Sequence, residues 1–141
     1  MSSNLKIYTD GGSRGNPGLS ACAFVVIDSG KIIHKDAKYL GIKTNNEAEY
    51  FGVLIALEWL ENNRNILSDK SEILFFLDSE LVVRQILDKY RVKASNLKEL
   101  KSKVKMLLED IQIKVNFFSI PREKNKIADL LLNRKIDEKI G

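Results

Sequence analysis

The sequence predicts an α/β fold with a five-stranded mixed sheet, an antiparallel meander followed by parallel strands, and helices on both faces. Two observations predict this class. Segments with the apolar pattern of strands fill most of the first forty residues. From residue 46 onward, segments with a helical period alternate with short apolar strands, which is typical of parallel strand connections. The 141 residues are the size of one domain, which we assign to residues 1–141.

The first half of the chain supplies the meander and a helix. Residues 5–10 alternate as a strand, and the glycine-rich residues 11–18 predict a loop. Residues 21–27 form an almost continuous apolar run, which a short turn joins to residues 31–39 as an antiparallel hairpin. Residues 46–60 then follow a helical period with little polar surface, so we expect a largely buried helix.

The second half alternates strands and helices. Residues 73–77 are apolar throughout and predict a central strand covered on both faces, followed by a short helix over residues 80–87. In the next helix we expect Asn96 to be the N-cap, with Glu99 as its capping-box partner. Residues 113–120 predict a further strand that Pro121 ends, and residues 124–136 predict a terminal helix.

The basic residues are concentrated in one part of the chain. The formal net charge is +4, and residues 84–105 hold eight basic residues against two acidic ones. Such a segment indicates a surface that faces a polyanion, and a solvated helix face is the alternative. No apolar run approaches the roughly 20 residues of a membrane span, and no secretory signal is visible. We therefore expect a cytoplasmic protein with no membrane partner.

Four acidic residues lie where burial is expected. Asp10 and Asp78 end predicted strands, Glu49 lies in the first turn of the most apolar helix, and Asp129 lies on the apolar side of the last helix. Buried carboxylates are costly unless they are paired or bind a metal, and all-oxygen ligands favour Mg²⁺ or Mn²⁺ over zinc. Taken one at a time, each could instead serve a helix as a cap or at its dipole, so both interpretations stand at this point.

Four motifs in order resemble the signatures of the type 1 ribonuclease H family and span nearly the whole chain. Residues 8–18 read YTDGGSRGNPG, residues 44–50 read TNNEAEY, residues 78–83 read DSELVV, and residues 121–129 read PREKNKIAD. The resemblance implies the ribonuclease H fold. It also implies that Asp10, Glu49, Asp78 and Asp129 are the catalytic, metal-binding carboxylates.

The same resemblance implies an activity. Members of the family hydrolyse the RNA strand of RNA/DNA hybrids and leave 5′-phosphate and 3′-hydroxyl ends. The cofactor implied is a pair of Mg²⁺ ions, with Mn²⁺ as a substitute, and two such ions can bracket one phosphodiester without a protein nucleophile. Asp10 would bridge both ions, Glu49 and Asp78 would share one, and Asp129 would hold the other. We expect a monomer whose partner is the hybrid.

The resemblance also implies substrate contacts. Amide side chains suit the 2′-hydroxyls of a minor groove, because an amide offers both donors and an acceptor. A turn is the alternative role for Asn16. The expected contact residues are Gly11, Asn16, Thr44, Asn45, Asn46, Glu80, Lys89, Arg91, Lys93, Arg122 and Asn125.

The chain departs from the family pattern at several points. Glu80 stands where many members have a glutamine, and its charge should weaken a contact with nucleic acid. Ser119 stands where many members have a histidine, so we expect catalysis without a histidine general acid. The basic protrusion of some relatives does not fit between the third and fourth motifs, and Lys89, Arg91 and Lys93 are expected to be a reduced substitute for it.

Two functions of other classes remain as alternatives. A binding module would dock hybrids or double-stranded RNA without cutting them, and a structural domain would keep the fold with no dependence on Mg²⁺. The four carboxylates argue against a pure binder, because it gains nothing from negative charge beside a phosphate. Within the enzyme class, cleavage of double-stranded RNA stays open.

Overall fold

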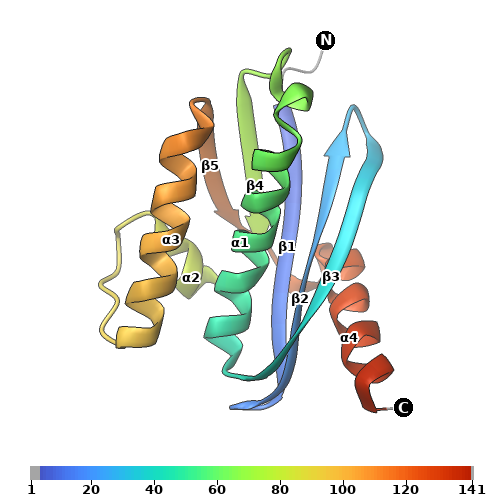
Figure 1. Ribbon diagram of the computed structural model, residues 1–141, viewed down its shortest axis with the longest axis vertical. Helices are drawn as coiled ribbons and strands as arrows, with labels where there is room; N and C mark the ends of the chain where they lie inside the picture. Colours follow the sequence, from blue (N-terminus) through green and yellow to red (C-terminus); the bar gives the residue numbers. More distant parts are fainter. Residues whose placement is uncertain (1–3, 141) are drawn as a thin grey trace.

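A computed structural model describes residues 4–140 of the protein. Its centre is a five-stranded mixed sheet with strand order β3-β2-β1-β4-β5 (Figure 1). The antiparallel strands β1, β2 and β3 are followed along the chain by β4 and β5, which pair in parallel with β1 and with each other. The predicted fold class is therefore confirmed. The strands are β1 (Asn4–Gly15), β2 (Gly18–Asp28), β3 (Lys31–Lys43), β4 (Glu72–Leu77) and β5 (Lys114–Ser119).

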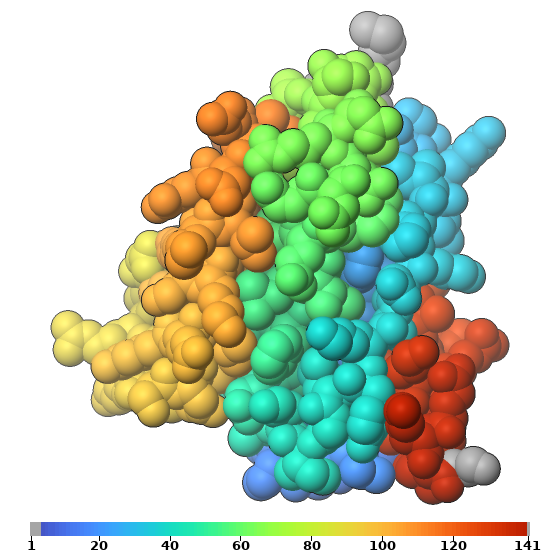
Figure 2. All heavy atoms as spheres, viewed as in Figure 1, coloured from blue at the N-terminus to red at the C-terminus, as the bar shows by residue number. Residues whose placement is uncertain are grey.

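Helices cover both faces of the sheet. On one face α1 packs on β1 and β2 and against α3, as Figures 1 and 2 show, while α4 packs on β1, β2 and β3 from the opposite face. Because β2 lies under helices on both faces, its side chains are buried on either side, which explains its unbroken apolar run. The helices are α1 (Asn45–Asn62), α2 (Glu80–Ile86), α3 (Ser95–Ile111) and α4 (Lys126–Ile140), with short 3₁₀ turns at Arg64–Leu67 and Arg122–Lys124.

The prediction of a loop over residues 11–18 is wrong. The β1–β2 ladder continues from the Gly11–Cys22 pair to the Gly15–Gly18 pair, so only Asn16 and Pro17 form the turn, and their peptide bond is cis. The hairpin closes so tightly that a Cβ on Gly18 would lie 2.0 Å from the Arg14 carbonyl oxygen. The glycines here permit a tight hairpin rather than marking a loop.

The strand expected to be covered on both faces is covered on one. Along β4, Ile73, Phe75 and Leu77 are buried, whereas Leu74 and Phe76 are half-buried. The reason is that α4 packs on the other half of the sheet. Phe76 instead stacks between aromatic rings of the neighbouring strands, with ring centroids 4.9 Å from Tyr8 and 5.7 Å from Phe118.

The prediction of a capping box between Asn96 and Glu99 is also wrong. Helix α3 begins at Ser95 after Ala94, and no side chain caps it. The Asn96 side chain lies beside Glu47 of α1 instead and lowers the pKa of that carboxyl group, so it joins the beginnings of the two helices. The expected apolar stripe of α3 does face the core, with Leu107 half-buried and the other members buried: Leu97, Leu100, Val104 and Ile111.

The backbones of β1 and α1 approach each other very closely. A Cβ on Gly11 would lie 2.1 Å from the backbone of Ala48, and a Cβ on Gly52 would lie 2.9 Å from the carbonyl oxygen of Asp10. Both positions therefore require the absence of a side chain. This contact brings the first turns of α1, including Glu49, directly beside Asp10.

We predict that Gly11→Ala destabilises the protein by about 3 kcal/mol or more, because the new methyl group can be accommodated only if α1 moves off β1. Gly12→Ala on the same strand is the matched control, since its Cβ would meet only the flexible Leu132 side chain at 3.3 Å. Urea unfolding of both variants measures the difference. Equal stability losses would contradict the prediction.

Candidate active site

Three carboxylates from three elements meet beside β1. Asp10 belongs to β1, Glu49 to α1, and Asp78 follows directly after β4. One oxygen from each lies within 4.8 Å of the others. The pairing of β1 with β4 ends at the Tyr8–Phe76 pair, so β1 continues past its neighbour and carries Asp10 to the point where β4 ends.

The Gly11 backbone orients two of these carboxylates. Its N–H lies 2.9 Å from Asp10 Oδ1 and 3.0 Å from Glu49 Oε1, and it donates to both. Asp10 and Glu49 are buried, with 4% and 5% of their surface exposed. Their positions are therefore fixed by the same close contact that Gly11 permits.

Burial raises the pKa of all three carboxyl groups. The pKa of Asp10 rises to about 7, with further contributions from the nearby charges of Asp78 and Asp129. The pKa of Glu49 rises well above its usual value because of burial and of the Asp10 charge. Burial raises the pKa of Asp78 as well, and the Arg122 guanidinium opposes that rise. Without a bound cation, the three carboxyl groups therefore retain protons to a higher pH, because no positive charge balances the carboxylates.

The cluster fits a divalent cation. Glu49 Oε2 and Asp78 Oδ2 are buried and accept no hydrogen bond, which is costly for carboxylate oxygens unless a cation binds them. All the candidate ligand atoms are oxygens, which favours Mg²⁺ or Mn²⁺.

Asp129 lies beyond this cluster but in the same cleft. It is half-buried on α4 and, with Asp10, lines a polar cleft of about 240 Å³. Asn133 Nδ2 donates to Asp129 Oδ1 over 3.2 Å. Of the four predicted carboxylates, the structure brings Asp10, Glu49 and Asp78 into close contact and places Asp129 with Asp10 at the polar cleft.

Two further residues of the cleft, Arg14 and Asn133, were not predicted. Arg14 donates to the backbone and side-chain oxygens of Asn133 and forms an ion pair with Asp137 at 2.7 Å. This chain of contacts connects the β1–β2 hairpin to α4 beside Asp129. The one available signal was that Asn133 follows Asp129 by four residues, which places the two on one helix face.

The expected substrate residues near α1 lie together. Thr44 caps α1 in a capping box with Glu47. Asn16 Oδ1 accepts from the Asn45 N–H over 3.0 Å, and Asn45 Oδ1 accepts from the Ser13 N–H over 2.9 Å. These contacts tie the hairpin turn to the beginning of α1. Gly11 and Asn45 also line the polar cleft, and Asn46 is half-buried in the first turn of α1.

The remaining expected residues are more dispersed. Glu80 forms an ion pair with Arg84 at 2.8 Å. Arg122 lies at the cleft with its side chain 85% exposed and its Nε 4.0 Å from Asp78 Oδ2. The exposed residues Lys89, Arg91 and Lys93 lie between α2 and α3, in the yellow segment that projects from the molecule in Figure 2.

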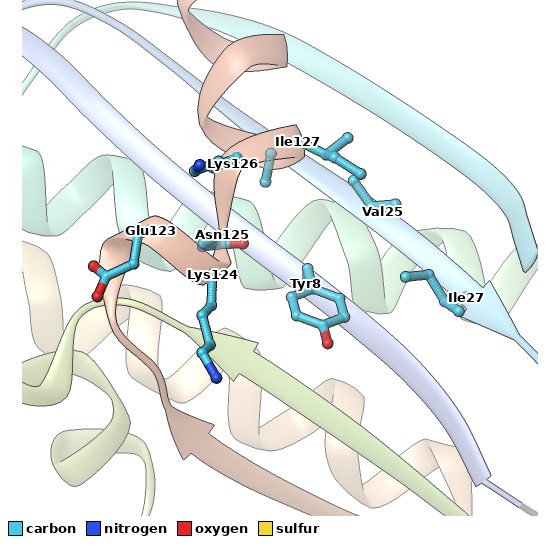
Figure 3. Close-up of a pocket in the computed structure, with 9 residues that line it drawn as sticks. Tyr8, Val25, Ile27, Glu123, Lys124, Asn125, Lys126 and Ile127 are labelled. Carbon is cyan, nitrogen blue, oxygen red and sulfur yellow. The ribbon is translucent and has the colours of Figure 1, made fainter. Parts of the chain in front are cut away.

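Asn125 is buried, with 1% of its surface exposed. It borders a separate hollow of about 320 Å³ between β1, β2 and the beginning of α4, shown in Figure 3. That hollow is mainly apolar, with Tyr8, Val25 and Ile27 on one side, and it contains none of the four carboxylates. Asp10 and Asp129 therefore lie at the polar cleft and not at this hollow.

The mixed sheet and the acidic cleft beside β1 together define an α/β protein of the ribonuclease H-like class. The ribonuclease H family matches residues 2–136, and the chain belongs to this family. Among residues 4–140, no helix is both long enough and apolar enough to cross a membrane.

Curated relatives support this assignment. Over 93% of its length the chain is 32% identical to a bifunctional protein of Mycobacterium tuberculosis, of which it spans 35%. It is 30% identical, again over 93% of its length, to ribonuclease HI of Halobacterium salinarum, of which it spans 63%. The chain thus spans from about a third to under two thirds of these relatives.

A solved structure is similar over almost its full length. LC11-RNase H1, isolated from compost and crystallised in complex with an RNA/DNA hybrid, superposes with a TM-score of 0.91 at 40% identity. The alignment covers 97% of this chain and 99% of that one.

We predict that, without divalent metal, the protein loses stability as pH rises from 5 to 8. The folded-state pKa of Asp10, about 7, lies above its ordinary value of 3.8, so its stabilising effect is complete below pH 4 and is lost as pH approaches 7. The expected loss is about 2–3 kcal/mol. Thermal unfolding in EDTA at the two pH values measures it.

Asp10→Asn is the control, because it should flatten this pH dependence. Mg²⁺ should stabilise the protein more at pH 8 than at pH 5, since protons compete with the cation at low pH. A metal-free protein that is more stable at pH 8 would contradict the prediction.

Proposed function

We propose that the chain is an endoribonuclease that hydrolyses the RNA strand of RNA/DNA hybrids and leaves 5′-phosphate and 3′-hydroxyl ends. The observation that carries the proposal is the convergence of Asp10, Glu49 and Asp78 within 4.8 Å, with buried oxygens that lack hydrogen bonds. The hybrid complex of LC11-RNase H1 supports the substrate class.

The proposed site would hold two Mg²⁺ ions, or Mn²⁺ in their place. Asp10 would contact both ions, Glu49 and Asp78 would share one, and Asp129 would hold the other. When bound, such ions activate a water molecule and stabilise the leaving oxygen of a phosphodiester. The protein's part is to hold the carboxylates in place, and the Gly11 N–H does this for Asp10 and Glu49.

Within residues 4–140, neither the single cysteine nor the single histidine lines the cleft. Burial raises the pKa of the Cys22 thiol to about 12, so this residue stays protonated. The single histidine, His34, stacks on Trp59 with ring centroids 4.7 Å apart, and β3 lies at the far edge of the sheet from β4. These observations support catalysis without a histidine general acid, with Ser119 at the position where many family members have a histidine.

Substrate contacts are proposed at the beginning of α1. The side-chain oxygens of Asn16 and Asn45 accept backbone N–H groups, so their amide N–H groups are the atoms left to donate to sugar hydroxyls or phosphate oxygens. Thr44 and Asn46 flank them at a helix N-terminus, which favours phosphate. Gly11 and Arg122 would border the scissile strand from the cleft.

The expected repulsion at Glu80 is reduced. Arg84 lies 2.8 Å from the Glu80 carboxylate, so the pair together carries no net charge. A nucleic acid near Glu80 would therefore meet a neutral ion pair and not a lone carboxylate.

We predict that Asp10→Asn lowers cleavage of an RNA/DNA hybrid at least about 1000-fold, because losing a metal ligand removes several kcal/mol of transition-state stabilisation. Hybrid affinity should change little. Labelled RNA/DNA, RNA/RNA, DNA/DNA and single-ribonucleotide duplexes, each with Mg²⁺ or Mn²⁺, test activity and substrate class on one gel.

Cutting of the hybrid alone supports the proposal. Cutting of RNA/RNA would widen the substrate class to double-stranded RNA. If the wild-type protein binds the hybrid but cuts none of the duplexes, the chain is a binding module and the proposal is wrong.

We predict that replacing Lys89, Arg91 and Lys93 with alanine weakens hybrid binding and flattens its salt dependence. Each lost phosphate contact should reduce the slope of log affinity against log salt by about one. Fluorescence anisotropy from 50 to 300 mM salt, in Ca²⁺ to prevent cleavage, measures the slope.

The matched control replaces three exposed lysines near the opposite end of the sheet, Lys6, Lys31 and Lys114. This control removes the same charge but should leave the slope within experimental scatter of the wild type. Equal effects of the two triple variants would assign the role to net charge rather than to the α2–α3 segment.

A further inference from the structure

We infer that Asn125 is a positioning residue that holds three of the four carboxylates in register for cation binding, and that it does not contact the substrate. The inference rests on the proposed function, since it concerns the same site. It differs from the role that the sequence predicted for Asn125, which was a substrate contact.

Burial separates Asn125 from its neighbours. Arg122, Glu123, Lys124 and Lys126 are exposed, whereas Asn125 has 1% of its surface exposed. Figure 3 shows its side chain directed back over β1, while Glu123 and Lys124 point away. A residue so buried cannot reach a duplex that lies on the surface. A polar amide at such a position needs hydrogen bonds to offset its burial.

The first of these hydrogen bonds joins Asn125 to β1. Asn125 Nδ2 donates to the carbonyl oxygen of Thr9 over 2.8 Å. Thr9 directly precedes Asp10, in the part of β1 that has no hydrogen-bonded partner in β4. The amide thus replaces the ladder partner that β1 lacks there and fixes the backbone that carries Asp10.

The other two contacts reach Asp78 and Asp129. The Asn125 side chain lies close enough to Asp78 to lower the pKa of that carboxyl group against the effect of burial. The Asn125 carbonyl oxygen accepts the Asp129 N–H over 3.2 Å at the start of α4. Asn125 therefore binds the β1 backbone next to Asp10 and lies beside Asp78 at the end of β4. Its own backbone carbonyl accepts the N–H of Asp129 on α4.

Only an amide of this shape can donate to the Thr9 carbonyl and lie beside Asp78 without adding a negative charge. Aspartate would lose the donor to the Thr9 carbonyl and would add a negative charge beside Asp78. Leucine has the same branching and number of side-chain heavy atoms, although it is bulkier, and it would leave the Thr9 carbonyl without its donor. Asn125 Oδ1 is buried and accepts no hydrogen bond, so the donor side of the amide fixes its orientation.

The test compares Asn125→Asp and Asn125→Leu with matched changes at Asn63. Asn63 Nδ2 also donates to a backbone carbonyl over 2.8 Å, that of Trp59, but it lies at the far end of α1. Titration calorimetry with Mn²⁺ in the absence of substrate gives the affinity for the cation. Thermal unfolding reports stability, and hybrid cleavage gives kcat and KM.

We expect both Asn125 variants to bind Mn²⁺ about 10–100-fold more weakly, as is typical when a residue that supports metal ligands is removed. At saturating Mn²⁺, KM for the hybrid should stay within about two-fold of the wild-type value. The Asn63 variants should lose stability without losing cation affinity. If the Asp and Leu variants do not fold, Asn125→Ser keeps a smaller donor and is tested by the same titration.

Two results would overturn the inference. One is a folded Asn125 variant with wild-type Mn²⁺ affinity. The other is a large rise in KM at unchanged Mn²⁺ affinity, which would indicate a substrate contact. A wild-type protein that binds no Mn²⁺ overturns both the inference and the proposed function. A wild-type protein that binds Mn²⁺ but cuts no hybrid overturns only the proposed function, because the titration contains no substrate.

Discussion

The contact between the backbones of β1 and α1 is the constraint on which the rest of the site depends. Gly11 and Gly52 allow a strand and a helix to approach so closely that a Cβ at Gly11 would overlap the Ala48 backbone at 2.1 Å. This approach places Glu49 beside Asp10 and lets one N–H bind both carboxylates. Buried apolar side chains from both elements, such as Ile7 of β1 and Val53 of α1, belong to the same core and hold the contact together. Packing of apolar side chains several residues away thus offsets the free-energy cost of burying the Asp10 and Glu49 carboxylates together.

Much of the fold could be predicted because its signals are local. The apolar run of β2 and the stripe of α3 follow from strand and helix periods alone. The errors arose where a local signal has two structural solutions. Glycine in residues 11–18 permits a loop or a tight hairpin, and only pairing with β2 decides between them. Asn96 resembles a helix cap, but its partner proved to be Glu47, which lies in another helix.

The candidate site divides in the same way. The four carboxylates were identified from burial patterns and motif resemblance, both of which can be read along the chain. The supporting contacts were not predicted, because they join residues far apart in sequence. Asn125 donates to Thr9 across 116 positions, and Arg14 contacts Asn133 across 119. Only the folded sheet, with α4 returning across β1, brings these pairs together.

The extension of β1 past β4 has a consequence for how the cleft can change over evolution. Beyond Tyr8, one wall of the cleft includes Gly11 and Gly12 of β1, so part of it is main chain. A wall of this kind keeps its shape when side chains elsewhere are replaced. The facing wall consists of side chains, chiefly from α4 and the Arg122 turn. New substrate preferences would therefore arise by substitution on that second wall, while the main-chain part of the first wall keeps its shape.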